Sequence, residues 1–193
     1  RDFFADTVRV ASAADIAELG LDPRYAGFQL STTINAGSAR IRGMEFSLRQ
    51  SLRRLGPWGR SFSVFVNGSR LLLDGNQNAD FSGFVPKSAS WGVTFARSPV
   101  TVMARWNWRS LQRNGAFAAL GTDSFNYVRA RTHLDVSVDW QVRRNLALFF
   151  SARNVFNVPN EAMRYGSLTP AYARMFMVSE FGAQITAGLK GSF

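Results

Sequence analysis

Hydrophobic and polar side chains alternate over long stretches of this chain, most regularly near its end. Between Glu180 and Phe193 one alternate set is apolar or small, while the other carries most of the polar side chains. The apolar set consists of Phe181, Ala183, Ile185, Ala187, Leu189, Gly191 and Phe193. A period of two residues held this long predicts a β-strand with one apolar and one polar face.

Residues 127 to 142 repeat this alternation, and here one face is charged. That face reads Tyr127, Arg129, Arg131, His133, Asp135, Ser137, Asp139 and Gln141. An arginine at mid-depth in hydrocarbon costs about 2–4 kcal/mol, so this face must look into water or a polar lumen. Further strands are predicted near residues 44–53, 61–67, 88–95, 100–109 and 145–153. Residues 1–10 have the pattern of the end of another strand. One more strand occupies residues 28–38 or continues without a break toward residue 55.

The connections between these strands alternate in length. Long ones cover residues 11–27, 74–84, 112–126 and 155–175, and short ones cover 56–59, 98–99 and 143–145. This rhythm is typical of transmembrane β-barrels, whose turns are tight on one side of the membrane. Trp106 and Trp108 near a long loop and Trp140 before a short turn fit an interfacial aromatic belt. We therefore expect an all-β fold, an antiparallel transmembrane β-barrel segment of about eight strands.

One short helix is expected in the first long connection. Ser12 with Asp15 three residues later has the pattern of a capping box, and Gly20 supplies a stop after residues 13–19.

Composition narrows the range of functions that the chain can have. The 193 residues include no cysteine and one histidine, His133, so we expect neither a metal site nor a cofactor. The formal charge of +10 comes mainly from arginines spread along the whole chain, which does not favour a nucleic-acid partner. No nucleophile, base and orienting group converge in the sequence, so we expect no catalytic residues and no enzyme.

Four stretches, in this order, resemble the carboxyl-terminal part of the TonB-dependent receptor barrel. Residues 35–46 are similar to its "N-x-G-x-a-x-x-x-G-h-E" strand, and residues 132–137 to its late "x-x-h-D-h-s" strand. Residues 154–157 match "N-h-F-[ND]", and the chain ends in a strand that finishes on Phe193.

The resemblance implies a barrel of about twenty-two strands around an amino-terminal plug. Residues 1–193 would be its carboxyl-terminal portion, with the plug domain and the TonB box upstream. The expected location is the outer membrane of a Gram-negative bacterium. The expected function is binding and import of a scarce nutrient, such as a ferric siderophore or an oligosaccharide. Expected partners are the TonB complex, the plug, the barrel assembly machinery, outer-membrane lipid and lipopolysaccharide, and a small-molecule ligand.

In this interpretation, one group of charged side chains faces the lumen and contacts the plug or an anionic ligand. The group comprises Arg105, Arg109, Arg129, Arg131 and Asp135. Three loop aromatics, Phe117, Phe125 and Tyr172, are further candidates for ligand contact. The resemblance also implies that Ile185, Leu189 and Phe193 form the signal recognised by the assembly machinery.

Two other readings stay open. A complete barrel of eight strands could close on itself and serve as an adhesin or a structural membrane protein. A soluble sandwich or barrel enzyme is the third reading. If the segment belongs to a larger barrel, its two outer strands would be open edges, which hydrocarbon does not tolerate. We then expect the isolated segment neither to insert stably nor to transport.

Overall fold

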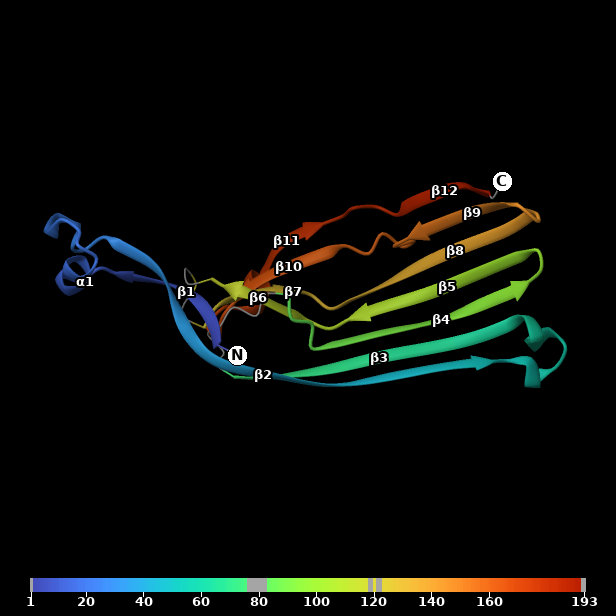
Figure 1. Ribbon diagram of the computed structural model, residues 1–193, viewed down its shortest axis with the longest axis horizontal. Coiled ribbons are helices and arrows are strands. Elements are labelled where there is room, and N and C mark those ends of the chain that lie inside the picture. Colours follow the sequence, from blue (N-terminus) through green and yellow to red (C-terminus); the bar gives the residue numbers. More distant parts are fainter. Residues whose placement is uncertain (1, 76–82, 118–119, 121–122, 192–193) are drawn as a thin grey trace. The chain divides into compact units, whose positions relative to one another are not determined.

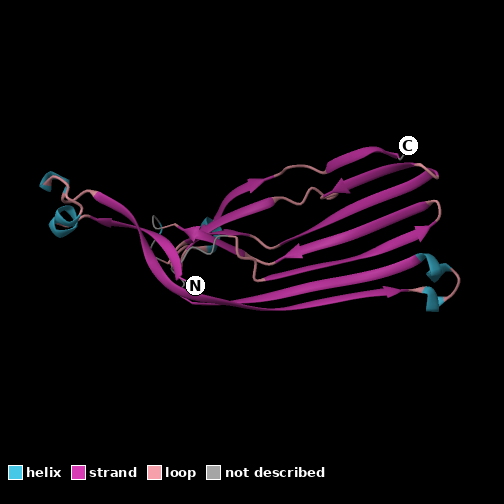
Figure 2. Ribbon diagram, viewed as in Figure 1, coloured by secondary structure: helices cyan, strands magenta, loops and turns pink. Residues whose placement is uncertain are grey.

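The computed structural model describes residues 2–75, 83–117, 120 and 123–191. Most of these residues form antiparallel strands, and one short α-helix, several short 3₁₀ turns and loops make up the rest (Figure 2). None of the described helices is long and apolar enough to cross a membrane. The chain divides into two compact units, Arg1–Ile41 with Leu73–Asp80, and Arg42–Leu72 with Phe81–Phe193.

The first unit contains a long hairpin. Strand β1 (Asp2–Val10) pairs antiparallel with the beginning of β2 (Gln29–Ser51), so that Val10 lies opposite Gln29. The predicted strands at the amino end are therefore confirmed, and the second runs unbroken to Ser51. Helix α1 (Ala13–Glu18) and the 3₁₀ turn η1 (Pro23–Tyr25) fill the connection between them.

The predicted capping box starts helix α1. The Asp15 backbone N–H donates to Ser12 Oγ at 3.2 Å, and the Ser12 N–H donates to the Asp15 carboxylate at 2.8 Å. Gly20 follows the helix with a φ of +65°, a conformation that favours glycine. The Arg9 guanidinium and Ser12 donate to the Asp15 carboxylate, which holds the pKa of Asp15 below its ordinary value.

The second unit is built on the rest of the larger sheet. Its strands are the end of β2, then β3 (Phe62–Gly75), β4 (Lys87–Arg97), β5 (Val100–Arg109), β8 (Arg131–Arg143), β9 (Leu146–Arg153) and β12 (Gln184–Gly191). They are hydrogen-bonded neighbours in that order, and with β1 the sheet has eight strands, the number that the sequence predicts (Figure 1). Two-residue turns join β4 to β5 and β8 to β9, while η2 (Arg53–Leu55) and η3 (Trp58–Ser61) join β2 to β3.

The strand register brings the predicted faces into line. Residues directly opposite in an antiparallel pair lie on the same face of the sheet. One apolar row across four strands is Val66, Trp91, Trp106 and Leu134, and the next is Val64, Val93, Ala104, Val136, Ala152 and Ile185. The opposite face has the rows Asn67, Ser90, Asn107 and His133, then Phe65, Gly92, Arg105 and Asp135. The alternation read from the sequence is thus confirmed as two continuous faces.

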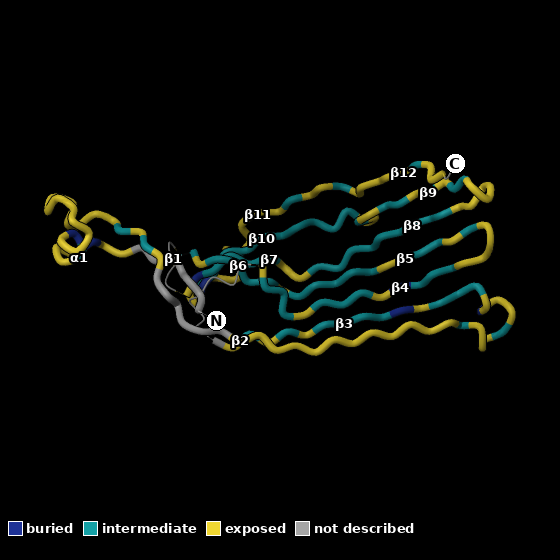
Figure 3. Tube along the Cα trace, in the orientation of Figure 1, coloured by how far each residue is buried: buried dark blue, intermediate teal, exposed yellow. Residues whose placement is uncertain are grey.

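The described residues form almost no hydrophobic core. Only Ala11, Ile16 and Phe65 are buried among their hydrophobic side chains. The apolar face is a single layer, and Met44 and Phe46 on it remain 69% and 58% exposed. Figure 3 shows exposed positions along most of β2 and β12, the two outer strands of the second unit's main sheet. An apolar sheet face without a second protein layer requires another apolar partner.

A second sheet of four strands occupies segments that the sequence analysis had taken mainly as loops. Its order is β6 (Gln112–Ala116), β7 (Phe125–Val128), β10 (Asn160–Tyr165) and β11 (Met175–Ser179), with the 3₁₀ turn η5 (Ala171–Ala173) between the last two. This order repeats that of β5, β8, β9 and β12, the strands that each one adjoins in the chain. The four strands therefore continue beyond the main sheet after a short break.

Three sequence expectations need correction here. The loops predicted at 112–126 and 155–175 contain strands, and the single strand predicted at 127–142 breaks at residues 129–130. On one side of the break the Arg129 N–H donates to the Glu161 carbonyl at 2.9 Å, beside β10, and on the other side Arg131 pairs with Arg109 of β5. The last strand, predicted from Glu180, begins at Gln184. Most of the predicted loop at 74–84 lies outside the described residues.

Gly92 in β4 offers a test of this packing. A Cβ at Gly92 would clash with the Ala104 carbonyl oxygen and lie 2.8 Å from the ring of Phe65. We expect Gly92→Ala to destabilise the full-length protein by about 1–3 kcal/mol, measured by thermal unfolding in detergent.

Gly68→Ala in the neighbouring strand β3 is the matched control. The nearest atom to a Cβ there is the Ser88 carbonyl oxygen, at 3.9 Å. Equal unfolding temperatures for the two variants would contradict the described register.

Candidate functional site

The polar face of the second unit's main sheet, here called the polar wall, carries a ladder of side-chain hydrogen bonds. Ser47 Oγ donates to Asn67 Oδ1 at 2.7 Å, and Asn67 Nδ2 donates to Ser90 Oγ at 3.3 Å. Ser90 lies directly opposite Asn107, whose Nδ2 donates to Asp135 Oδ2 at 2.9 Å. The hydrogen bonds link β2 to β3 and β3 to β4, and separately β5 to β8, while the strand register places the two parts side by side. Such small polar side chains suit a surface that meets water or a polar ligand.

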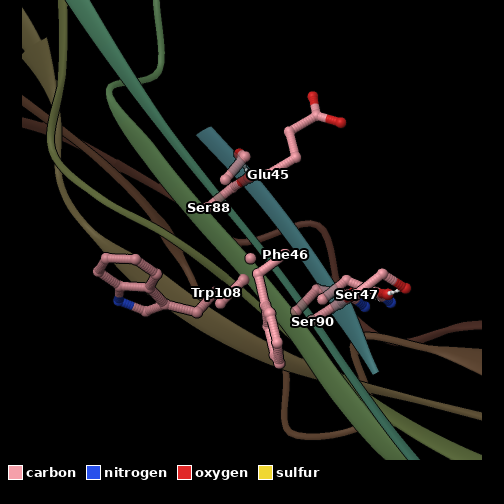
Figure 4. Close-up of a pocket in the computed structure, with 11 residues that line it drawn as sticks. Glu45, Phe46, Ser47, Ser88, Ser90 and Trp108 are labelled. Atoms are coloured by element: carbon pink, nitrogen blue, oxygen red, sulfur yellow. Dashed lines mark hydrogen bonds between the residues drawn. The ribbon is translucent and has the colours of Figure 1, made fainter. Parts of the chain in front are cut away.

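A hollow of about 460 Å³ lies over four of these strands, β2 to β5. Its polar lining includes Ser47, Ser88 and Ser90, and Ser88 Oγ lies 2.7 Å from Ser69 Oγ. In Figure 4, Glu45 and Ser47 reach to one side of the strands, and Phe46 and Trp108 reach to the other. The hollow therefore presents hydroxyl, amide and carboxylate groups on the polar wall.

The carboxylate of Asp135 is occupied by hydrogen bonds within the chain and is not free to bind a ligand. Its Oδ1 accepts the backbone N–H of Asn154 at 3.0 Å, and its Oδ2 accepts Asn107 Nδ2. His133 Nε2 lies 3.7 Å from the same Oδ2. Both carboxylate oxygens are thus engaged, which makes this residue a support for the turn that follows β9.

The turn after β9 is fastened by two asparagines in the left-handed region. Asn154, at φ 52°, accepts the Val158 N–H through Oδ1 at 2.9 Å and donates through Nδ2 to the Val158 carbonyl at 3.1 Å. Asn157, at φ 48°, accepts the Gly182 N–H through Oδ1 at 2.9 Å. Asparagine tolerates this backbone conformation better than most residues. Residues 154–157 therefore join the end of β9 to the segment that leads into β12.

Arg105 also has a local role. Its guanidinium carbon lies 5.5 Å from the centre of the Phe65 ring, and Nη2 lies 3.8 Å from Met103 Sδ. It is directly opposite Asp135, yet among the described residues the two form no ion pair. This arginine packs over the buried ring of Phe65.

Arg109 and Arg131 are the pair that the structure brings together. They lie directly opposite each other on the polar wall, where β5 and β8 leave the main sheet. Arg109 Nη2 donates to Asn160 Oδ1 at 3.3 Å, but the Nε atoms of both arginines are buried without a partner. No carboxylate of the described chain forms an ion pair with either. Like charges directly opposite are destabilising, so this pair favours an anion from outside the described residues.

Arg129 does not join that pair. Its Nη1 lies 2.6 Å from Glu161 Oε2, on the four-stranded sheet. The five predicted lumen residues thus fall into four environments, and of these residues only Arg109 and Arg131 face each other as two cations with a buried Nε that lacks a partner.

The four-stranded sheet carries arginine–aromatic contacts that sequence reasoning missed. The Tyr127 and Tyr165 rings stack at 4.1 Å, and the Arg164 guanidinium lies 4.0 Å from the Phe117 ring and 3.6 Å from the Phe176 ring. Burial, and next the neighbouring Tyr165, raise the pKa of the Tyr127 hydroxyl. Only strand pairing brings these residues together, so no local motif could have revealed them.

The three predicted loop aromatics also differ in their surroundings. Phe117 and Phe125 each face an arginine, at 4.0 Å from Arg164 and 4.5 Å from Arg113. Tyr172 is 89% exposed. Of the three, it is the ring left accessible to a ligand.

Two of the three residues of the predicted assembly signal are among those that the structure describes. Ile185 and Leu189 lie in β12 on the apolar face, and they are 66% and 67% exposed. Phe193 lies outside the described residues. In the part of the chain that the structure describes, no group of three or more His, Cys, Asp or Glu side chains could hold a metal ion.

Comparison with known proteins gives one family and one fold. Residues 4–155 match the family model described as TonB dependent receptor-like, beta-barrel. A solved structure named "Copper transporter OprC" matches with a TM-score of 0.65 and 15% sequence identity, covering 100% of this chain and 27% of that one. At this identity the match shows the fold alone, and the chain spans about a quarter of OprC's length. No curated protein sequence matches the chain.

The role of Asp135 can be separated from that of an ordinary surface charge. We expect Asp135→Ala to destabilise the full-length protein by about 1–3 kcal/mol, because the Asn154 N–H and the Asn107 amide lose their acceptor. Amide hydrogen exchange at residues 154–158 should rise with it.

Asp139→Ala is the control on the same strand face. Asp139 pairs with Lys190 at 2.6 Å, and both side chains are about half exposed, at 47% and 60%. Its loss should cost less than about 1 kcal/mol. Equal effects of the two substitutions would refute the supporting role of Asp135.

Proposed function

Because this chain belongs to the TonB-dependent receptor β-barrel family, we propose that it is part of an outer-membrane receptor that binds and imports a scarce nutrient. In this proposal residues 1–193 are the carboxyl-terminal portion of the barrel, and a plug domain lies upstream. The chain contributes wall, external loops and the closing strand, and it catalyses no reaction.

The observation that best supports this function is that the main sheet has one continuous apolar face and one continuous polar face. The apolar face is a single exposed layer, and the opposite face bears a ladder of hydrogen bonds. Lipid suits the first face and a hydrated lumen suits the second. This pairing supports a location in the outer membrane of a Gram-negative bacterium, with the tight turns on the periplasmic side and the four-stranded sheet outside the cell.

The proposed partners follow from the same placement. The plug of the same chain would lie against the polar wall, and the TonB complex would act through the upstream segment. The barrel assembly machinery would recognise the apolar positions of the last strand, Ile185, Leu189 and Phe193. Lipid and lipopolysaccharide would cover the apolar face.

The nutrient that we propose is anionic. Arg109 and Arg131 present two guanidinium groups with no carboxylate partner among the described residues. Guanidinium forks match carboxylate and phosphate oxygens in geometry and charge. A ferric siderophore that carries carboxylates, or an acidic oligosaccharide, would meet these requirements.

The second candidate, a complete small barrel with an adhesive or structural role, has less support. Its eight strands would have to close by pairing β12 with β1, and within the described residues β12 pairs with β9 alone. The hypothesis of a soluble enzyme gains no support from the sheet, since Phe65 is the one buried hydrophobic side chain among the described residues of its strands.

Growth experiments test the proposed transport. A strain that lacks the full-length gene should lose TonB-dependent growth on at least one anionic nutrient from a panel of ferric carboxylate chelates and acidic oligosaccharides. The wild-type gene should restore that growth. The double variant Arg109→Gln/Arg131→Gln should need at least about tenfold more of the nutrient, because charge-assisted hydrogen bonds contribute about 1.5–3 kcal/mol each.

Arg144→Gln, an exposed arginine in the turn between β8 and β9, is the matched control and should leave uptake unchanged. Growth that does not depend on TonB would contradict the proposed transport. Unaltered growth of the double variant would contradict the proposed binding pair.

A further inference from the structure

Two cations face each other on the apolar side of the sheet. Arg70 in β3 lies directly opposite Lys87 in β4, in register with the apolar pair Val66 and Trp91 on the same face. Arg42 in the neighbouring strand β2 belongs to the same alternate set as Met44 and Phe46. These three basic residues, here called the basic rim, are all exposed.

The basic rim has no internal counter-charge within the described chain. None of the recorded ion pairs or side-chain hydrogen bonds of the described residues involves the side chains of Arg42, Arg70 or Lys87. Like charges placed directly opposite in adjacent strands repel each other. An anion held between them turns that repulsion into two attractive contacts. The pair therefore fits a negatively charged group that approaches from outside the barrel.

The position of the basic rim along the membrane normal shows which part of the membrane surrounds it. In β4, Lys87 and Arg97 lie ten positions apart, and the outward positions between them are Ala89, Trp91, Val93 and Phe95. At about 3.3 Å per residue and a strand tilt of about 40°, this interval spans roughly 25 Å along the membrane normal. That is the height of the apolar band of outer-membrane barrels. Lys87 thus lies where hydrocarbon gives way to headgroups, on the side of the long loops.

We propose that the basic rim binds the phosphates of lipid A, the lipid anchor of lipopolysaccharide. The long-loop side faces the outer leaflet, whose headgroup is a phosphorylated disaccharide. The acyl chains would lie against Met44, Phe46 and Trp91, directly below the charges. Arginine and lysine near an anionic membrane surface attract it and hold the barrel at a fixed depth.

The inference depends on the membrane orientation of the proposed function and not on the nutrient or its transport. A lipid-binding assay without nutrient therefore distinguishes a failure of this site from a failure of uptake.

Native mass spectrometry of the full-length protein, stripped of lipopolysaccharide in detergent, tests the site with diphosphoryl lipid A as the probe. Arg70→Gln/Lys87→Gln should weaken binding roughly 30-fold, which corresponds to about 1 kcal/mol for each charge. The exchange Arg70→Lys/Lys87→Arg retains both charges and should bind within about threefold of wild type. Arg60→Gln/Arg97→Gln removes two exposed charges near the short turns and should bind like wild type.

Comparing different lipids with the wild-type protein completes the test. Fully dephosphorylated lipid A should bind the wild-type protein at least tenfold more weakly than the diphosphoryl form, and phosphatidylglycerol should not displace the latter. Equal binding of both lipid A forms would overturn the proposal, because acyl contacts alone would then explain it. Displacement by phosphatidylglycerol would assign the rim to phospholipid instead. Wild-type affinity in the Arg70→Gln/Lys87→Gln variant would also overturn it.

Discussion

The structure depends on one constraint, the fixed register of antiparallel backbone hydrogen bonds. A shift by one residue would exchange the two faces of any strand, because side chains alternate with a period of two. The observed register aligns Val66, Trp91 and Trp106 on one face and Asn67, Ser90 and Asn107 on the other. Everything proposed about lipid, lumen and ligand follows from that alignment.

Side-chain hydrogen bonds then decide where strands end and change neighbours. Asp135 accepts the Asn154 N–H, and Asn157 accepts the Gly182 N–H, so the connections at one end of the sheet are joined to each other. Beyond them the strands resume as a separate four-stranded sheet in the same order. Two of the four stretches that carried the family resemblance, at 132–137 and 154–157, thus meet in space. Their shared contact gives a physical reason for the aspartate, and the left-handed backbone at Asn154 and Asn157 gives one for the asparagines.

The sequence revealed those parts of the fold that a local pattern encodes. Alternation located the strands of the main sheet and their faces, and Ser12, Asp15 and Gly20 located the helix. It missed the four-stranded sheet, since segments such as Gln112–Ala116 lack alternation and are specified by their neighbours. It also could not show that Arg129 pairs with Glu161, or that Arg109 faces Arg131. Those contacts join residues 22 or more positions apart. They could not be predicted without knowing how the strands pair and in which register.

The central claim is that lipid touches one alternate set of side chains while water wets the other. Spin labels placed one at a time at Val136, Val138 and Leu189, and at Asp135 and Lys190, in the full-length protein in bilayers test it directly. The account predicts that oxygen collides preferentially with labels at the first three positions, and a water-soluble nickel chelate with labels at the last two. The reverse pattern, or equal collision rates at all five positions, would contradict it.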